Sequence, residues 1–292
     1  MFQSFFEAQQ GKVNLLFCNI AFDITFVYVL AIFNFFWNNI QIYDAYYSLG
    51  PLSKFLLIQH FSGYGIKEFN GKNFILTILM YVWSVRLFTH IFGKWEGFPD
   101  QDKRITTIEF KGYGGKKRFF FWLWFSPFIA FMNALLISFL TLPVTLFQFR
   151  NPNLYDNLVG ENLTLSDFVG FLVAFFGLAV QTIADQESVW WRTYGKTNKV
   201  ADYGTRRYVR YPQYFGEIIF WAGVYIFTIS SFPSNIFQDY SQWIYWPIGN
   251  ILETLWLCHM SDIMDNQVLK RKDNWKEYKQ KVKFALIPFF RF

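Results

Sequence analysis

Long apolar stretches, separated by short polar segments, dominate the chain. A helix needs about 20 mostly apolar residues to cross the hydrocarbon core of a bilayer. Stretches of this length occupy residues 13–37, 73–92, 119–149, 165–184, 211–231 and 243–264. The pattern predicts an all-α fold, a polytopic transmembrane helix bundle of about six or seven spans.

Two segments depart from this regular pattern. Residues 48–66 contain glycines and Lys54, which favours an interfacial or re-entrant piece, or a poor seventh helix. The stretch 119–149 contains Pro127 and Pro143, so a spanning helix is expected to tilt or kink there. No internal repeat or low-complexity linker separates the stretches. We therefore predict a single membrane domain over residues 1–292.

Basic residues alternate between the polar segments. Segments 93–118, 185–210 and 265–292 hold seven, six and eight Lys and Arg, which is 21 of the 27 in the chain. The intervening segments 150–164 and 232–242 hold one and none. Basic loops concentrate on one side of a membrane, so this alternation fits consecutive crossings. The net charge of +6 is thereby explained by topology and does not indicate a nucleic-acid partner.

Composition agrees with a lipid bilayer as the surrounding partner. Hydrophobic residues make up 53% of the chain and charged residues 16%, whereas soluble domains carry about 25% charged residues. Cys18 and Cys258 lie in apolar stretches, and the three histidines are scattered, so no metal site is expected. The sequence leaves the endoplasmic reticulum and the mitochondrial inner membrane equally open as locations.

Polar side chains recur at helical spacing near the basic-side ends of the last three stretches. An ionisable group at bilayer depth requires a partner or a wet cavity, so these residues are functional candidates. The three polar stripes are Gln181 with Asp185, Tyr214 with Glu217 and Trp221, and His259 with Asp262 and Asn266. They predict a polar pocket opening toward the basic side; the alternative is a set of hydrogen bonds that only joins the helices.

Three ordered motifs in the second half of the chain resemble a known family. They are QTIADQESVWWR (181–192), DYGTRRYVRYPQYFGEIIFWAGVYI (202–226) and WKEYKQKVKFALIPFF (275–290). The chain resembles the DUF1295 family, within the larger group of steroid 5α-reductase-like membrane reductases. The resemblance covers residues 165–292 well, with weaker similarity at 86–90 and Asp23.

The resemblance implies a reductase that uses NADPH to reduce a C=C bond in a lipophilic, steroid-like or enoyl-lipid substrate. Matched position by position, Gln181 and Asp185 hold polar atoms of the cofactor, and Arg192 meets its phosphates. The same matching places Gln213, Tyr214 and Glu217 beside the nicotinamide amide. Charge alone suggests Arg206, Arg207 and Arg210 as further phosphate contacts. The resemblance assigns no catalytic donor; Asp23 and Tyr81 are candidates.

The chain also departs from the family pattern. Tyr211-Pro212-Gln213 stands where the family has His-Pro-Asn, and a histidine expected near Asp265 and Asn266 is absent. Such losses suit an alternative function, a non-catalytic subunit of a larger membrane complex such as a respiratory assembly of the mitochondrial inner membrane. A membrane lipid or prenyl methyltransferase, with a similar motif after its basic loop, is a second alternative.

Overall fold

The computed structural model describes residues 11–37, 39, 42–61, 71–93, 121–148, 163–195, 198–229 and 247–287. These residues form eight α-helices and no strand, which confirms the predicted all-α fold. The chain divides into two compact units, residues 1–161 and 162–292, described separately below. The single membrane domain stays a prediction.

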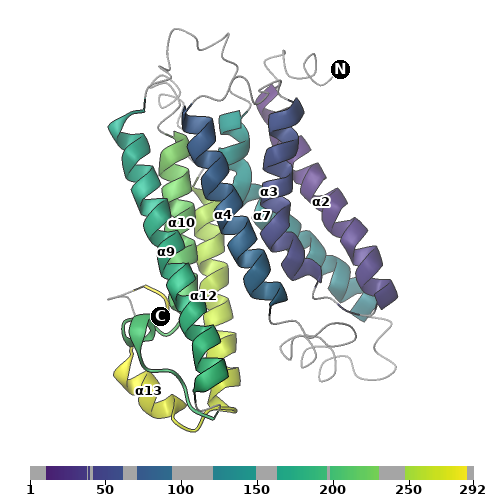
Figure 1. The fold of residues 1–292 in the computed structure, drawn as a ribbon. Helices are drawn as coiled ribbons and strands as arrows, with labels where there is room; N and C mark the ends of the chain where they lie inside the picture. Colours follow the sequence, from purple (N-terminus) through teal and green to yellow (C-terminus); the bar gives the residue numbers. More distant parts are fainter. Residues whose placement is uncertain are drawn as a thin grey trace. The chain divides into compact units, whose positions relative to one another are not determined.

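The first unit contains four of these α-helices (Figure 1). They are α2 (Gly11–Trp37), α3 (Ile42–Phe61), α4 (Gly71–Phe92) and α7 (Ser126–Gln148), with a π-helical turn η3 (Phe121–Phe125) leading into α7. Helix α3 contacts α2, α4 and α7, and α2 packs along α7. Buried Val27, Tyr46 and Ile137 lie in the core between these helices.

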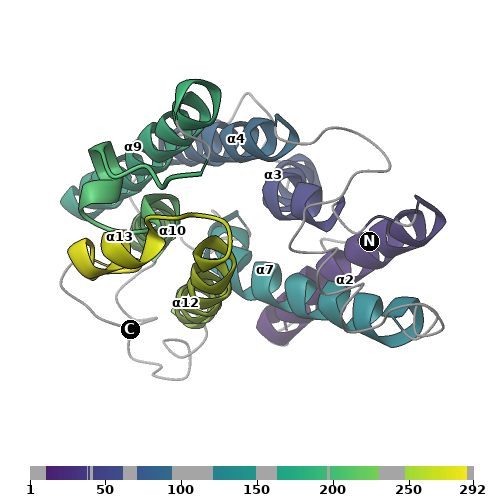
Figure 2. The same cartoon turned by 90° about the horizontal axis from the view of Figure 1, so that it is seen from below.

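The second unit contains the other four (Figures 1 and 2). They are α9 (Leu165–Tyr194), α10 (Pro212–Ile229), α12 (Ile248–Leu269) and the short α13 (Trp275–Lys281), with a 3-10 turn η4 (Gly204–Arg207) before α10. Helix α9 starts at a capping box, in which Thr164 and Asp167 each accept a backbone N–H of the other. It ends at Gly195, whose N–H donates to the carbonyl of Trp191 at 2.8 Å.

Four of the described helices are long and apolar enough to cross a membrane, at residues 17–37, 71–92, 121–148 and 165–194. This supports an integral membrane protein, but the predicted number of six or seven spans is not confirmed. Helices α3, α10 and α12 fall outside that set because they carry proline, lysine or carboxylate side chains along their length.

The helix limits correct several predicted boundaries. Helix α9 continues to Tyr194, ten residues past the predicted end at 184, because helical hydrogen bonding does not stop where the apolar run stops. Helix α12 lies five residues later than the predicted stretch 243–264. The described part of segment 48–66 is an unbroken continuation of α3, despite Pro51.

Glycines bring α9 and α10 into close contact. A Cβ placed on Gly177 would lie 2.4 Å from the backbone N of Phe220, and one on Gly223 would lie 2.1 Å from the N of Ala174. Ordinary Cβ contacts begin near 3.4 Å, so only glycine fits at these positions. Small residues allow transmembrane helix backbones to approach in this way. This contact positions the polar side chains described next.

Candidate functional site

A hydrogen-bonded group joins α9 to α10 inside the second unit. The Nε2 of Gln181 donates to Oε2 of Glu217 at 2.7 Å, and the Nε1 of Trp221 donates to Oε1 at 2.9 Å. The exposed fractions of Gln181, Glu217 and Trp221 are 0%, 6% and 1%. Gly216 makes room for this group, because a Cβ there would lie 2.6 Å from Cγ of Gln181. The interhelical hydrogen bond between the first two predicted stripes is thus present.

Two buried amide oxygens in this region accept no hydrogen bond from the protein, Oε1 of Gln181 and Oε1 of Gln213. An ionised carboxylate only accepts hydrogen bonds, so Gln181 has to present its NH₂ to Glu217 and turn its oxygen away. Gln213 precedes Glu217 by one helical turn, on the same face of α10. A buried acceptor without a donor costs about 1–3 kcal/mol. A ligand that donates N–H groups here would remove that cost.

One face of α9 leads from this group to the basic end of the unit. Gln181, Asp185, Ser188 and Arg192 follow at intervals of four, three and four residues, which places them on one side of the helix. Gln181 and Asp185 are buried, Ser188 is half-buried and Arg192 is exposed. At about 1.5 Å per residue, Arg192 lies about 16 Å along the axis from Gln181.

Two predicted phosphate contacts converge on Ser188. The Nε of Arg192 donates to the Ser188 carbonyl at 3.3 Å, and Nη2 of Arg206 donates to its hydroxyl at 3.1 Å. Two guanidinium groups at one residue repel each other and favour an anion between or beside them. A planar guanidinium also suits bidentate contact with phosphate. The structure therefore brings Arg192 and Arg206 together at the outer end of the polar face of α9.

Glu187 fixes the loop that carries Arg206. Its Oε2 accepts the Thr205 N–H at 3.1 Å and the Thr205 hydroxyl at 2.5 Å, and its carbonyl accepts the Tyr203 hydroxyl at 2.9 Å. Gly204, with φ of +59°, lies against this carboxylate: a Cβ there would be 1.7 Å from Oε1 of Glu187. Glu187 was not among the predicted site residues; its position two residues after Asp185, ahead of a Gly-Thr turn, was the available signal.

Nη1 of Arg206 donates to the carbonyl of Arg210 at 3.5 Å, but the side chain of Arg210 has other partners. It is 3% exposed, and its Nη2 bonds Oδ2 of Asp265 at 3.1 Å. Its Nη1 donates to the carbonyls of Val282 and Lys283 at 3.1 and 2.9 Å. Arg210 thus fastens the C-terminal segment to α12, and its predicted role as a phosphate contact stays a prediction.

Asp265 is the second residue that the sequence analysis did not assign to the site. Its Oδ1 accepts the hydroxyl of Tyr211 at 2.7 Å, and Oδ2 accepts Lys279 at 2.7 Å in addition to Arg210. Burial, together with the hydrogen bond to this carboxylate, raises the pKa of Tyr211 above its ordinary value. The neutral phenol therefore remains a donor to Asp265. Tyr214 stacks on Tyr211, with ring centroids 5.7 Å apart.

The third predicted stripe lies on the exposed face of α12. His259, Asp262 and Asn266 are all exposed, whereas the buried residues of α12 include Glu253, Leu257, Ser261 and Asp265, each four residues after the last. Both faces of α12 carry polar residues, so periodicity alone could not identify the buried one. The expectation that His259 and Asp262 converge with the other stripes is wrong.

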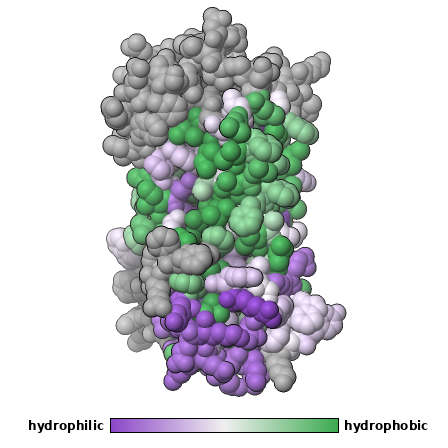
Figure 3. All heavy atoms as spheres, turned by 90° about the vertical axis from the view of Figure 1, so that its left-hand side faces the viewer, coloured by the Kyte–Doolittle hydropathy of each residue, from purple (hydrophilic) through white to green (hydrophobic). Residues whose placement is uncertain are grey.

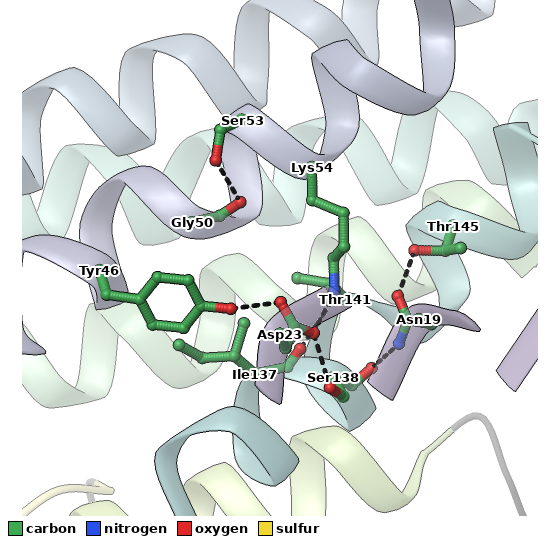
Figure 4. A network of polar contacts seen from close by, with 10 residues as sticks. All are labelled: Asn19, Asp23, Tyr46, Gly50, Ser53, Lys54, Ile137, Ser138, Thr141 and Thr145. Atoms are coloured by element: carbon green, nitrogen blue, oxygen red, sulfur yellow. Dashed lines mark hydrogen bonds and ion pairs between the residues drawn. The ribbon is translucent and has the colours of Figure 1, made fainter. Parts of the chain in front are cut away.

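The candidate donor Asp23 belongs to a separate polar network in the first unit (Figure 4). Its Oδ2 accepts Lys54 and Ser138, each at 2.6 Å, and its Oδ1 accepts the hydroxyl of Tyr46. Asp23 and Lys54 are 0% and 2% exposed. The other candidate, Tyr81, is 56% exposed.

The comparison with known families decides where this chain belongs. The sequence model described as "Protein of unknown function (DUF1295)" matches residues 38–283, well over half of the chain. The chain belongs to the DUF1295 family. No protein of curated function matches the chain, and neither does any solved structure. The DUF1295 match covers the helices α9, α10 and α12 that carry the site, together with most of the first unit.

Proposed function

We propose that this DUF1295 protein is a membrane-embedded, NADPH-dependent reductase of a C=C bond in a lipophilic substrate, of the steroid-like or enoyl-lipid class. The proposal rests on one observation. A buried carboxamide–carboxylate group on α9 and α10 has two amide oxygens that lack donors, at the inner end of a polar face that reaches Arg192 and Arg206.

The residues fit this cofactor at both ends. The carboxamide NH₂ of a nicotinamide supplies N–H donors of the kind that Oε1 of Gln181 and Oε1 of Gln213 lack. Arg192 and Arg206 offer guanidinium groups to phosphates. The separation of about 16 Å between the two ends requires an extended ligand such as a dinucleotide. When bound, NADPH supplies the hydride that adds to the β-carbon of the activated double bond.

The protein's own residues orient and enclose the reacting groups in this proposal. Glu217, held by Trp221, fixes the rotation of the Gln181 amide, so the oxygen of Gln181 keeps one direction. The close α9–α10 contact excludes water from this carboxylate, which strengthens each hydrogen bond around it. A dry, preorganised polar site of this kind suits a reaction in which charge develops on a carbonyl oxygen.

Replacing one unpaired acceptor tests the proposal. Gln213→Leu removes a buried unpaired acceptor, so the ligand-free protein should be as stable as wild type or more stable, while NADPH binding weakens about tenfold. Gln186→Ala, at an exposed amide on α9, is the matched control and should change neither quantity. Binding is measured by calorimetry on the full chain in nanodiscs, and turnover by NADPH absorbance with enone and enoyl-lipid substrates.

Two results would refute the reductase. One is wild-type protein that does not bind NADPH; the other is Gln213→Leu protein that binds it as tightly as wild type. The same titration with S-adenosylmethionine tests the methyltransferase alternative.

A non-catalytic complex subunit is the second candidate, and a specific contact favours it. By the family resemblance, Tyr211 stands where the family has histidine, and Asp265 lies near the place where a second histidine is expected. The two side chains hydrogen-bond to each other at 2.7 Å. Positions that depart from the reductase pattern thus form one internally satisfied contact. Co-purification of further subunits after mild detergent extraction, with no NADPH turnover, would support this reading. Recovery of a monomer alone would oppose it.

A further inference from the structure

The basic end of the second unit has a charge surplus that the proposed reductase site does not use. From Lys199 to Lys283, eight basic side chains are exposed among the described residues of this unit, against four exposed carboxylates. One of these carboxylates, Asp202, is already paired with Lys281 at 3.1 Å. We call the exposed basic residues of this range the basic collar.

Three exposed aromatic residues, called here the aromatic belt, indicate the level at which we expect the lipid headgroups. Trp190, Tyr194 and Tyr208 are exposed by 53%, 74% and 72%. Exposed tryptophan and tyrosine concentrate at the headgroup level of membranes. On α9, exposed apolar residues such as Phe175 and Phe176 precede the belt. Figure 3 shows the same order, with a hydrophobic face that ends at a strongly hydrophilic region.

Helix α13 presents charged rather than aromatic side chains at its surface. Its aromatic side chains Trp275 and Tyr278 are 3% and 2% exposed, because they pack inside the unit with Leu286. They are therefore not available to insert into a bilayer. Lys276 on the same helix is exposed and carries its charge outward, and Lys279, although paired with Asp265, is 51% exposed. A surface of this kind attracts anionic headgroups without inserting apolar side chains.

We propose that the basic collar selectively binds anionic phospholipid headgroups of the leaflet on its side of the membrane. A lipid is favoured over a free phosphate ion because the collar borders the apolar, aromatic-ringed surface. Its charges are also spread over α13, the end of α12 and the loop after α9, too widely for a single small ion. This binding is independent of the reductase proposal and holds equally for a non-catalytic subunit.

Spin-labelled lipids test the selectivity directly. The full chain is reconstituted in phosphatidylcholine vesicles that contain spin-labelled phosphatidylglycerol or phosphatidylcholine, and the motionally restricted fraction is measured by electron paramagnetic resonance. Wild type should prefer phosphatidylglycerol by about fivefold, the contribution expected from one cation near the surface. High salt should abolish the preference, because exposed charges are screened.

The matched variants change charge at four exposed positions, Lys270, Arg271, Lys276 and Lys283. Replacement of all four by Gln should bring the ratio close to one, whereas exchange of each Lys for Arg and of Arg271 for Lys should preserve it. Equal association of both lipids with wild type would overturn the proposal, as would a preference that survives neutralisation or high salt. Competition by inorganic phosphate at constant ionic strength would show a free-phosphate site instead and would also overturn it.

Discussion

The close α9–α10 contact makes Gly177→Ala the most informative single substitution. The new methyl group would meet the backbone N of Phe220 at 2.4 Å and the carbonyl of Gly216 at 2.7 Å. Neither is the end of a flexible side chain, so no rotamer change relieves the overlap. The helices have to separate by about 1 Å, the shortfall from the ordinary limit of 3.4 Å.

The expected cost follows from that separation. Overpacking of a fitted contact costs about 1–3 kcal/mol. Gln181 lies one turn along α9 from Gly177, so the separation also lengthens its 2.7 Å bond to Glu217; losing a bond to a charged group costs about 1.5–3 kcal/mol. The higher intrinsic helix propensity of Ala than of Gly offsets about 1 kcal/mol of this loss. We expect a net loss of about 1.5–5 kcal/mol.

Unfolding in mixed detergent micelles by titration with sodium dodecyl sulfate, followed by far-ultraviolet circular dichroism, measures the loss. Gly71→Ala is the control, because no atom lies within 4 Å of a Cβ built at that glycine. It should stay within about 0.5 kcal/mol of wild type. If Gly177→Ala unfolds at the same titration midpoint as this control, the close-contact reasoning is refuted.

Three further substitutions test the polar networks and the titration of a buried tyrosine. Asp23→Asn leaves Lys54 buried without its counter-charge and should lower the free energy of unfolding by about 3–5 kcal/mol in the same titration. The double variant with Lys54→Met should recover most of this loss, and a failure to recover it would contradict the pairing. Asp265→Asn should loosen the C-terminal segment and speed its proteolysis, whereas Asp202→Asn, in an exposed pair, should not; equal rates would oppose the fastening role. Burial raises the pKa of Tyr278 to about 12, above its ordinary value of 10.0, so stability held below pH 10 should be lost as pH rises toward 12. Between pH 10 and pH 12 the free energy of unfolding of Tyr278→Phe should fall by up to about 3 kcal/mol less than that of wild type. Identical pH profiles of the two proteins would refute the raised pKa of Tyr278.

The apolar stretches alone were enough to predict an all-helical membrane protein. In the hydrocarbon core every backbone N–H and C=O group has to be hydrogen-bonded within its own segment, so a long apolar stretch is expected to form a helix. The pairing of Gln181 with Glu217 was also within reach, because helical spacing and the motifs placed both in one polar region. The number of spans did not follow from hydropathy, since α3, α10 and α12 carry polar residues that lower their mean hydropathy.

Only the tertiary structure decided which polar residues meet. Asp265 rather than Asp262 is buried, because the packing of α12 against its neighbours selects one of two polar faces. Arg210 bonds to Asp265 and to the C-terminal segment, while Arg206 reaches Ser188; their equal charges gave no means of telling them apart. Hydropathy and spacing are properties of one segment, whereas these contacts depend on the rotation of one helix against another, which is fixed by side chains distant in sequence.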